Sequence, residues 1–346
     1  MRLLWIMTVL ASCAEYATLD DACPKRVPGQ ASVSNEAALE GLSRLGCYRQ
    51  YVGLKQGSHS DSLQELVDSH AAYVAFHGPP EPQLHVQVPG EEGYTGLNVL
   101  ERIRGVDLDI RPAQDGIERT YWDLHFVGTQ GKAERVIDRW MDDPMVRSVL
   151  LHPGWLGGGL EMVDYLPEGS ETEGEVLTYT NLLAAIDSPS AVTLQRPLVY
   201  PRDGQTGVPT GRWIVQGDDA YCGERLGYPL SVLVVEDGTP DSALELVVEG
   251  ASLHGPDGAV AIEERRGWAY GDEWSEITNQ VVFQPLEPLA PRETYTFEAA
   301  LLWRGDGERE TISVRFETGP DGDLEPDAGM AESCGFEVGE PTAGTG

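Results

Sequence analysis

Residues 136–159, VIDRWMDDPMVRSVLLHPGWLGGG, decide the fold class of this chain. Apolar side chains recur at helical spacing over the first part of this stretch and end with Trp140, which predicts an amphipathic helix. Pro144 stops that helix, because the residue before a proline disfavours the helical conformation. The apolar run from His152 to Leu160 predicts a strand, and the glycine triplet predicts a tight turn against a sheet. A helix leading into a strand indicates a mixed α+β domain.

Two further helices are predicted upstream of this stretch. The first starts near residue 34, with apolar side chains at three- and four-residue steps: Ala38, Leu42, Leu45, Tyr48 and Val52. The second starts at Ser62, which forms a capping box with Glu65, and Gly78 ends it. His70 lies on the apolar side of this helix, where we expect a hydrogen-bonded core histidine. Residues 79–100 are rich in proline and glycine and predict an extended loop.

The motifs, in this order, resemble the CAP superfamily of cysteine-rich secretory, antigen 5 and pathogenesis-related proteins, in its bacterial form. LSRLGCYRQYVGL and LQELVDSHAAYVAFHG are similar to the paired helices that open that domain. LHVQVPGEEGYTGLNVLERIRG is similar to the bacterial segment that follows, and Trp140, Asp143-Pro144 and Arg147 are similar to its second half. The resemblance covers residues 34–165. It implies a CAP-like α-β-α sandwich, which we place at residues 32–166.

The resemblance also implies a cavity lined by two histidines and two acidic residues, where some members hold a divalent metal. His85 matches the first histidine, Glu118 the glutamate of the family's G-E-N motif, and Glu101 is a weaker match for the other acid. Val146 replaces the second histidine, and a valine can neither ligate a metal nor transfer a proton. His125 is the candidate replacement, although a surface histidine is the favoured interpretation. We therefore expect no cofactor, with a divalent metal as the alternative.

From residue 197 the chain changes to short runs of β-forming residues separated by turn signals. PLSVLVV, ALELVVEGASL, VVFQPL, TYTFEAALLW and TISVRFET predict an all-β sandwich at residues 197–319. Tyr295, after LAPRET, resembles the tyrosine corner of immunoglobulin-like (Ig-like) and fibronectin type III domains, whose hydroxyl bonds nearby backbone. Residues 167–196 are assigned to a linker that opens with the acidic run EGSETEGE, and residues 320–346 to an acidic tail.

The N-terminus predicts export. Arg2 and the short apolar run LLWIMTVL are typical of a signal peptide, placed at residues 1–12. LASC, ending at Cys13, matches the bacterial lipobox, in which the cysteine is acylated, so residues 13–31 become a lipidated tether. The alternative is an ordinary signal peptide with an incidental cysteine. Ala14 is not the aspartate that retains lipoproteins at an inner membrane, which favours lipid anchoring at the outer membrane.

The other cysteines predict disulfide bonds. They are Cys23, Cys47, Cys222 and Cys334, an even number, and an exported protein meets an oxidising environment. Three pairings are open. We prefer Cys23 with Cys47, and Cys222 with Cys334.

Charge and missing motifs limit the function. The formal net charge is −33, from 57 acidic and 24 basic residues. Such a surface repels phosphate backbones, so nucleic acid is not expected as a partner. The motifs G-x-S-x-G, H-E-x-x-H and G-x-x-x-x-G-K-[ST] do not occur in the sequence.

Three functional hypotheses follow. The favoured one is a cell-envelope lipoprotein whose degenerate CAP-like domain binds or scaffolds a lipid, glycan or protein ligand without catalysis. The first alternative is a metal-dependent or hydrolytic enzyme that uses His85 and Glu118, with His125 as a further candidate. The second alternative is a structural envelope protein with a vestigial cavity.

Overall fold

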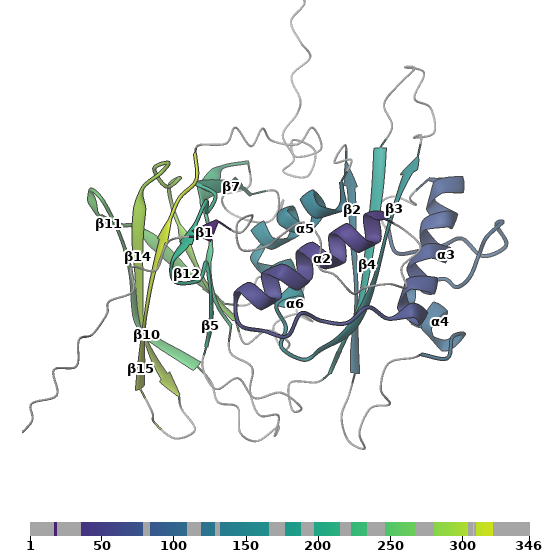
Figure 1. Cartoon of the computed structure of the whole chain (residues 1–346), viewed down its shortest axis with the longest axis horizontal. Helices are drawn as coiled ribbons and strands as arrows, with labels where there is room; N and C mark the ends of the chain where they lie inside the picture. The colour runs from purple at the N-terminus through teal and green to yellow at the C-terminus, as the bar shows by residue number, and fades with distance from the viewer. Residues whose placement is uncertain are drawn as a thin grey trace, which may run out of the picture.

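The structure, a computed structural model, has a mixed α+β fold (Figure 1). It describes residues 17–18, 36–78, 84–108, 119–128, 132–165, 177–187, 197–214, 223–233, 246–266, 280–303, 307 and 309–320. No helix among these residues has both the length and the apolar character that a membrane crossing requires. The signal peptide, Cys13 and the tail from residue 321 lie outside the described residues.

The first half is built on a three-stranded antiparallel sheet in the order β2-β4-β3. The strands are β2 (Arg119–Gly128), β3 (Trp155–Tyr165) and β4 (Leu177–Asp187). The assignment of residues 167–196 to a linker is therefore wrong over β4, which is the central strand. The strand was missed because its core, NLLAA, is rich in leucine and alanine and shows no two-residue alternation. A strand buried on both faces has no reason to alternate.

Helices cover both faces of this sheet (Figure 1). One face packs against α2 (Glu36–Tyr51), α5 (Ala133–Asp142) and α6 (Pro144–Leu150), and the other against α3 (Asp61–His77) and α4 (Val99–Arg104). The predicted helices α2, α3 and α5 are confirmed. The predicted cap of α3 is wrong by two residues, because Ser60 rather than Ser62 accepts the bond from the Leu63 amide, at 3.2 Å.

The stretch 136–159 contains one helix more than predicted. Pro144 ends α5 but also begins α6, since proline suits the first position of a helix. The Asp143 carboxylate caps α6 and accepts from the Met145 amide at 2.8 Å. The glycine triplet forms part of β3 and is not a tight turn. A Cβ atom on Gly159 would lie 2.5 Å from the Gln64 nitrogen, so glycine allows α3 to pack directly on the strand.

The second half consists mainly of two four-stranded antiparallel sheets, ordered β11-β10-β14-β15 and β12-β13-β9-β5. Phe283 and Phe297, one from each sheet, have ring centroids 5.0 Å apart, so the two sheets share a core. The Ala290 amide donates to the Tyr295 hydroxyl at 2.7 Å, which confirms the predicted bond of that tyrosine to nearby backbone. The strands are β5 (Leu198–Tyr200), β9 (Leu230–Leu233), β10 (Leu246–Gly255), β11 (Gly258–Val260), β12 (Ile262–Arg266), β13 (Gln280–Pro285), β14 (Thr294–Trp303) and β15 (Arg309–Glu317).

Two short strand pairs complete the second half. The pair β7 (Gly211–Trp213) and β8 (Arg225–Gly227) is antiparallel. The pair β1 (Ala17–Thr18) and β6 (Gln205–Thr206) is parallel. The strand β1 belongs to the predicted tether 13–31. This part of the tether is therefore paired with β6 of the second half of the chain.

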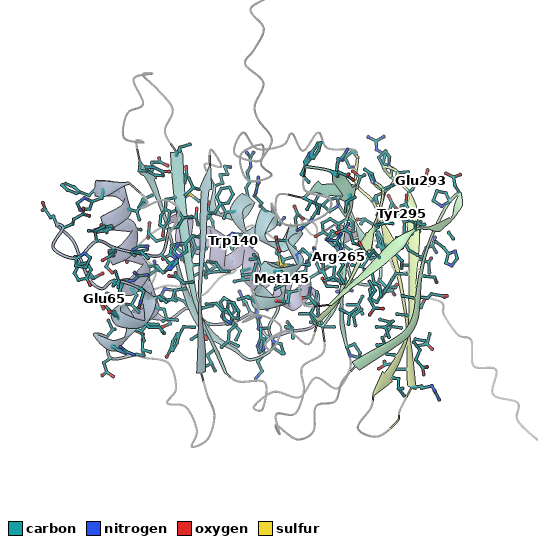
Figure 2. All side chains as sticks on the ribbon, turned by 180° about the vertical axis from the view of Figure 1, so that it is seen from behind. Glu65, Trp140, Met145, Arg265, Glu293 and Tyr295 are labelled. Carbon is teal, nitrogen blue, oxygen red and sulfur yellow. The ribbon has the colours of Figure 1, made fainter. Side chains whose placement is uncertain are left out.

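The two halves share one hydrophobic core. The same cluster contains Leu45 and Trp140 of the first half and Val232 and Phe283 of the second. Figure 2 shows Trp140 and Met145 in the middle of the molecule, between the three-stranded sheet and the strands of the second half. The two halves therefore form a continuous body.

Arg147 of α6 forms hydrogen bonds between the two halves. Its side chain is fully buried and donates to the Pro229 carbonyl at 3.0 Å and to the Ser231 hydroxyl at 2.9 Å. The ring centroids of Tyr200 and Tyr228 lie 4.7 and 5.1 Å from the guanidinium carbon. Aromatic faces attract cations, most strongly where water is excluded. Arg147, the second of the two arginines in the stretch 136–159, is thus an interdomain residue.

The disulfide prediction can be followed at one residue. Cys47, buried in α2, is disulfide-bonded. Its partner, like Cys23, Cys222 and Cys334, lies outside the described residues. The pairing of Cys23 with Cys47 stays a prediction.

Candidate functional site

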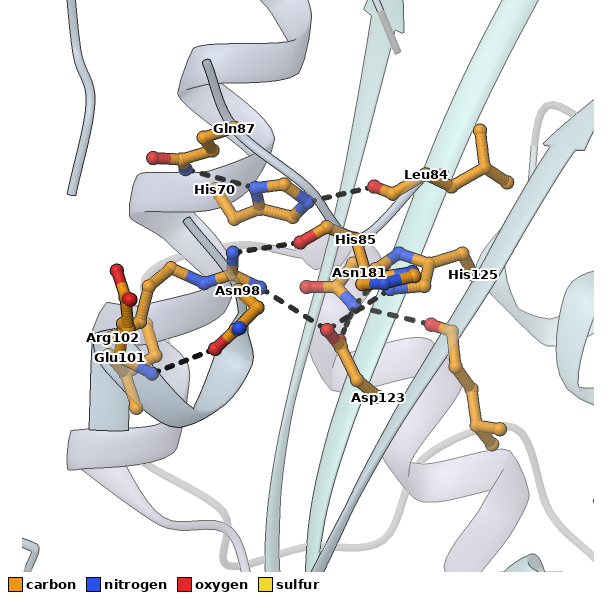
Figure 3. A network of polar contacts seen from close by, with 12 residues as sticks. His70, Leu84, His85, Gln87, Asn98, Glu101, Arg102, Asp123, His125 and Asn181 are labelled. Atoms are coloured by element: carbon orange, nitrogen blue, oxygen red, sulfur yellow. Dashed lines mark hydrogen bonds and ion pairs between the residues drawn. The ribbon is translucent and has the colours of Figure 1, made fainter. Parts of the chain in front are cut away.

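Polar side chains gather on the sheet face that α3 and α4 cover (Figure 3). Asp123 and His125 are two residues apart on β2, so both point to the same side of the sheet. Asn181 of β4 is the register partner of His125, and Tyr179 precedes it by two residues on that side. We use the name polar cluster for these four residues with those that reach them from α3, the following loop and α4: His70, His85, Gln87 and Arg102.

Asp123 is the centre of the polar cluster. Its carboxylate accepts from Asn181 Nδ2 at 2.7 Å and from the Arg102 guanidinium at 3.2 Å, and His125 Nε2 lies 3.1 Å from Oδ2. The side chains of Arg102 and Asp123 are only 2% and 8% exposed. Burial acts to raise the pKa of Asp123, but the contacts with His125, Arg102 and Asn181 outweigh it and hold that pKa at about 2.

His125 connects Asp123 to Tyr179. Its Nδ1 lies 2.6 Å from the Tyr179 hydroxyl. Burial raises the pKa of Tyr179 well above 10, so the phenol keeps its proton and donates it to Nδ1. Nε2 then carries the proton and lies 3.1 Å from the Asp123 carboxylate, close enough for charge attraction but outside hydrogen-bond geometry. The His125 side chain is 8% exposed, so the surface interpretation of this residue is wrong.

His70 is the buried histidine of α3, and its hydrogen-bonded core role is confirmed. Nε2 donates to the Leu84 carbonyl at 3.0 Å, and Nδ1 accepts from Gln87 Nε2 at 3.0 Å. Burial, and then the charge of Arg102, lower the pKa of His70 to about 4. His70 is therefore neutral at physiological pH, and both ring nitrogens are used inside the protein.

His85 lies at the outer edge of the polar cluster. The residue is exposed, and its ring centroid is 6.3 Å from that of His125. Arg102 donates to the His85 carbonyl at 3.0 Å, so the salt bridge to Asp123 also fixes the backbone of the loop. Partial burial and the nearby His125 lower the pKa of His85. The structure therefore brings His85 and His125 together, as the enzyme hypothesis requires of these two residues.

The other expected cavity residues do not join them. Glu101 is exposed and accepts from the Leu97 amide at 3.0 Å, while its own amide donates to the Asn98 side chain at 3.0 Å. It stabilises the start of α4 and faces away from Asp123 (Figure 3). Val146 lies on α6, on the opposite face of the sheet, and packs against the main hydrophobic core. Glu118 lies outside the described residues.

The sequence resemblance implies that Val146 lines the same cavity as His85, but the two residues lie on opposite faces of the sheet. The presence of valine at this position therefore does not bear on the chemistry of the polar cluster. The residues that sequence reasoning missed are Arg102, Asp123, Tyr179 and Asn181. The spacing of Asp123 and His125 on one strand was the available signal. Tyr179 and Asn181 could not be predicted as partners, because the residues of β4 are assigned to a linker in the sequence analysis.

The described residues show no group of three or more His, Cys, Asp or Glu side chains arranged to hold a metal ion. The donor set of the polar cluster does not fit zinc either. A metal ligand needs an open lone pair, and the Nδ1 lone pair of His125 accepts from Tyr179. Arg102 brings a positive charge to the same carboxylate that a metal would need.

A second polar pair lies on the same sheet face, one strand away. Glu161 of β3 is the register partner of Asn181 and bonds Asp68 of α3. Burial, and then the bond to Asp68, raise the pKa of Glu161 to about 7. Gln64 holds the pair in place and donates to Asp68 at 2.6 Å. The α3 face of the sheet thus carries both histidines and carboxyl groups with shifted pKa values.

Comparisons with known proteins leave the family open. No protein-family model matches the chain, and no curated protein matches it. Among solved structures the chain is similar to an outer surface protein from Borrelia burgdorferi, at 13% identity and a TM-score of 0.29, over 42% of this chain and 88% of that one. A TM-score this low supports no conclusion about shared fold or function.

Proposed function

We propose that the protein is an exported cell-envelope lipoprotein that binds or scaffolds another envelope component without catalysing a reaction. In this proposal residues 32–166, completed by β4, form the CAP-like domain, and residues 197–319 form the Ig-like sandwich. Helices on both faces of the three-stranded sheet and the bonded Tyr295 hydroxyl support these assignments. Cys13 carries the lipid, and the outer membrane is the favoured location.

The observation that carries the non-catalytic part is the saturation of the buried histidines. A general base needs a lone pair within hydrogen-bond reach of its substrate. His70 accepts from Gln87 and His125 accepts from Tyr179, each at the nitrogen that is not protonated. The acceptor nitrogens of both buried histidines are therefore occupied inside the polar cluster. The effect of the cluster is mechanical, because it fixes the loop after α3 to the sheet.

Zinc titration by calorimetry tests this proposal against the enzyme alternative. We expect no heat of binding in the intact protein and none in His85→Ala. His254→Ala is the matched control, because His254 is an exposed histidine on β10, far along the chain from the polar cluster. Zinc binding that survives in His254→Ala and disappears in His85→Ala would overturn the non-catalytic proposal.

Palmitate labelling in a bacterial host tests the predicted address. Labelling should be lost in Cys13→Ser and kept in Cys23→Ser, since acylation requires the cysteine of the lipobox. Unchanged labelling of Cys13→Ser would show that the N-terminus is not a lipobox.

A further inference from the structure

The strand β1 is the first described point, in chain order, at which the chain joins the folded body. Ala17 pairs in parallel with Gln205 of β6, and Thr18 with Thr206. The described residues resume only at the start of α2. Cys13, the cysteine of the proposed lipobox, precedes β1 by four residues. The pairing of β1 therefore decides how closely a lipid on Cys13 holds the body.

The segment that contains β6 is bonded to the edge of the sandwich. Before β6, the Gly204 amide donates to the Arg315 carbonyl of β15 at 2.7 Å. After β6, the Val208 amide donates to the Glu317 carbonyl at 3.1 Å. The Arg315 amide also donates to the Asp203 carboxylate at 2.9 Å. Because these bonds reach β15 from both ends of β6, β1 is paired with a segment that is itself held in place.

Covalent geometry limits the distance between Cys13 and this edge. An extended chain spans at most about 3.5 Å per residue, so Cys13 and Ala17 are at most about 14 Å apart. If α2 were the first attachment, the chain from Cys13 to Glu36 could span up to about 80 Å. The pairing of β1 thus shortens the tether about fivefold. The acyl chains of a lipoprotein lie in the bilayer and hold its cysteine at the headgroups.

The two ends of the molecule differ in their relation to this attachment. Figure 1 shows β1 among the strands of the second half, whereas α3 and α4 lie at the end of the long axis that is farthest from the second half. The chain carries a net charge of −33, which disfavours a broad contact with anionic headgroups. A contact restricted to the edge that holds the tether satisfies both conditions.

We propose that the edge of the second half formed by β1, β6 and the end of β15 faces the lipid headgroups, and that α3 and α4 are directed away from the bilayer. In every orientation that a tether of about 14 Å allows, this edge stays near the headgroups. The inference rests on the proposed acylation of Cys13. It deepens the proposed binding function, because it states which surface the membrane occupies and which surface remains open to another envelope component.

Photochemical cross-linking to lipid tests the proposed orientation. The acylated full chain is placed in vesicles of phosphatidylethanolamine and phosphatidylglycerol, with tritium on the phosphatidylethanolamine. The photoreactive residue benzoylphenylalanine replaces either Ser313, which is exposed on β15, or Phe76, which is 69% exposed near the end of α3. Tritium transfer to the protein should be about tenfold greater at Ser313, because the short tether keeps the β15 edge at a high effective concentration of lipid.

Matched insertions test whether β1 causes this orientation. A linker of about 20 glycine and serine residues is inserted before β1, between Glu15 and Tyr16, or after β1, between Gly29 and Gln30. The insertion before β1 should lower tritium transfer at Ser313 about tenfold, because effective concentration falls roughly as the −3/2 power of tether length. The insertion after β1 lies outside the short tether and should leave the transfer within about twofold of the parent value.

Mass spectrometry of the N-terminal peptide separates this inference from the proposed function. A parent protein without acyl chains would overturn both the lipoprotein proposal and the orientation. An acylated protein with equal tritium transfer at Ser313 and Phe76 would overturn the orientation alone, and so would equal effects of the two insertions. Greater transfer at Ser313 that only the insertion before β1 removes would support the inference.

Discussion

Arg102 and Arg147 are buried on opposite faces of the three-stranded sheet, and the groups that surround them differ. Arg102, on the α3 side, meets the carboxylate of Asp123. Arg147, on the α6 side, donates its described hydrogen bonds to neutral oxygens and lies over Tyr200 and Tyr228. Arg102 is thus bonded directly to an opposite charge, whereas Arg147 is bonded to neutral oxygens and covered by aromatic faces, and the nearby buried Asp142 carboxylate interacts with it only through space.

The difference separates two tasks. The carbonyls and tyrosines around Arg147 come from both halves of the chain, so this arginine sets how the halves are joined. The contacts of Arg102 stay within the first half and hold the loop at His85. Changing Arg147 should therefore affect the whole molecule, and changing Asp123 should affect one face of the sheet.

The largest effect is expected for Arg147→Met. Methionine fills much of the volume but removes the donor to the buried Pro229 carbonyl and leaves the Met141 carbonyl with only the Tyr228 hydroxyl at 3.3 Å, which should lower the free energy of unfolding by about 4 kcal/mol. Urea denaturation followed by tryptophan fluorescence measures the loss. Calorimetry should also show a broader transition, because one polar link between the halves is gone while the shared core and the bond from Gln280 to the Pro144 carbonyl remain.

Arg309→Met is the matched control for Arg147→Met. Arg309 is 70% exposed and pairs with Glu249, so its loss should leave the free energy of unfolding close to that of the parent chain. If Arg147→Met were as stable as this control and its transition as sharp, Arg147 would not be a link between the halves.

The sequence was a good guide to elements that have local signals. The spacing of apolar residues located α2, α3 and α5, and the turn signals located the strands of the second half. It is a poor guide to β4, because a leucine- and alanine-rich segment shows no two-residue alternation. It is also a poor guide to α6, because a proline that ends one helix can occupy the first position of the next.

The site was harder to predict than the fold, because its partners are distant in sequence. Arg102 and Asp123 are 21 residues apart, and Asp123 and Asn181 are 58 apart. The resemblance directed attention to Val146, although the neighbouring Arg147 has the structural role. Its contacts, Pro229 and Ser231, lie 82 and 84 residues further along the chain, where no local pattern marks them.

A smaller effect, confined to one face, is expected for Asp123→Asn. Asparagine keeps the shape but leaves the buried Arg102 cation without its counter-charge, which should cost about 3 kcal/mol. Hydrogen exchange should become faster in residues 84–98, because Arg102 no longer fixes the His85 carbonyl. A single unfolding transition should remain, since Arg147 is untouched.

Asp164→Asn is the control for Asp123→Asn on the same sheet. Asp164 is exposed and accepts from the Thr178 hydroxyl at 2.9 Å, so the change should cost well under about 1 kcal/mol. If hydrogen exchange in residues 84–98 were unchanged in Asp123→Asn, the Arg102–Asp123 salt bridge would not be what holds this loop. The proposed difference in role between Arg102 and Arg147 would then be wrong.

The smallest expected effect is the pH dependence that Glu161 gives to the α3 face. Burial, and then Asp68, raise its pKa from 4.5 to about 7, so the folded protein binds this proton more tightly than the unfolded chain. Its contribution is therefore complete below pH 4.5 and is lost as the pH rises through 7. Urea denaturation should show that Glu161→Gln reduces the change in the free energy of unfolding across this pH range by about 1–2 kcal/mol.

Glu65→Gln sharpens this last test, because Glu65 is an exposed carboxyl on the same helix as Asp68 (Figure 2). The control should keep the parent slope between pH 4.5 and 7, since no buried proton is removed. An equal slope in Glu161→Gln and Glu65→Gln would mean that the Glu161–Asp68 pair holds no extra proton. The remaining pH dependence of the α3 face has the opposite sign. His70, with its pKa lowered from 6.5 to about 4, and Asp123, with its pKa lowered from 3.8 to about 2, contribute stability that is lost as the pH falls through these ranges.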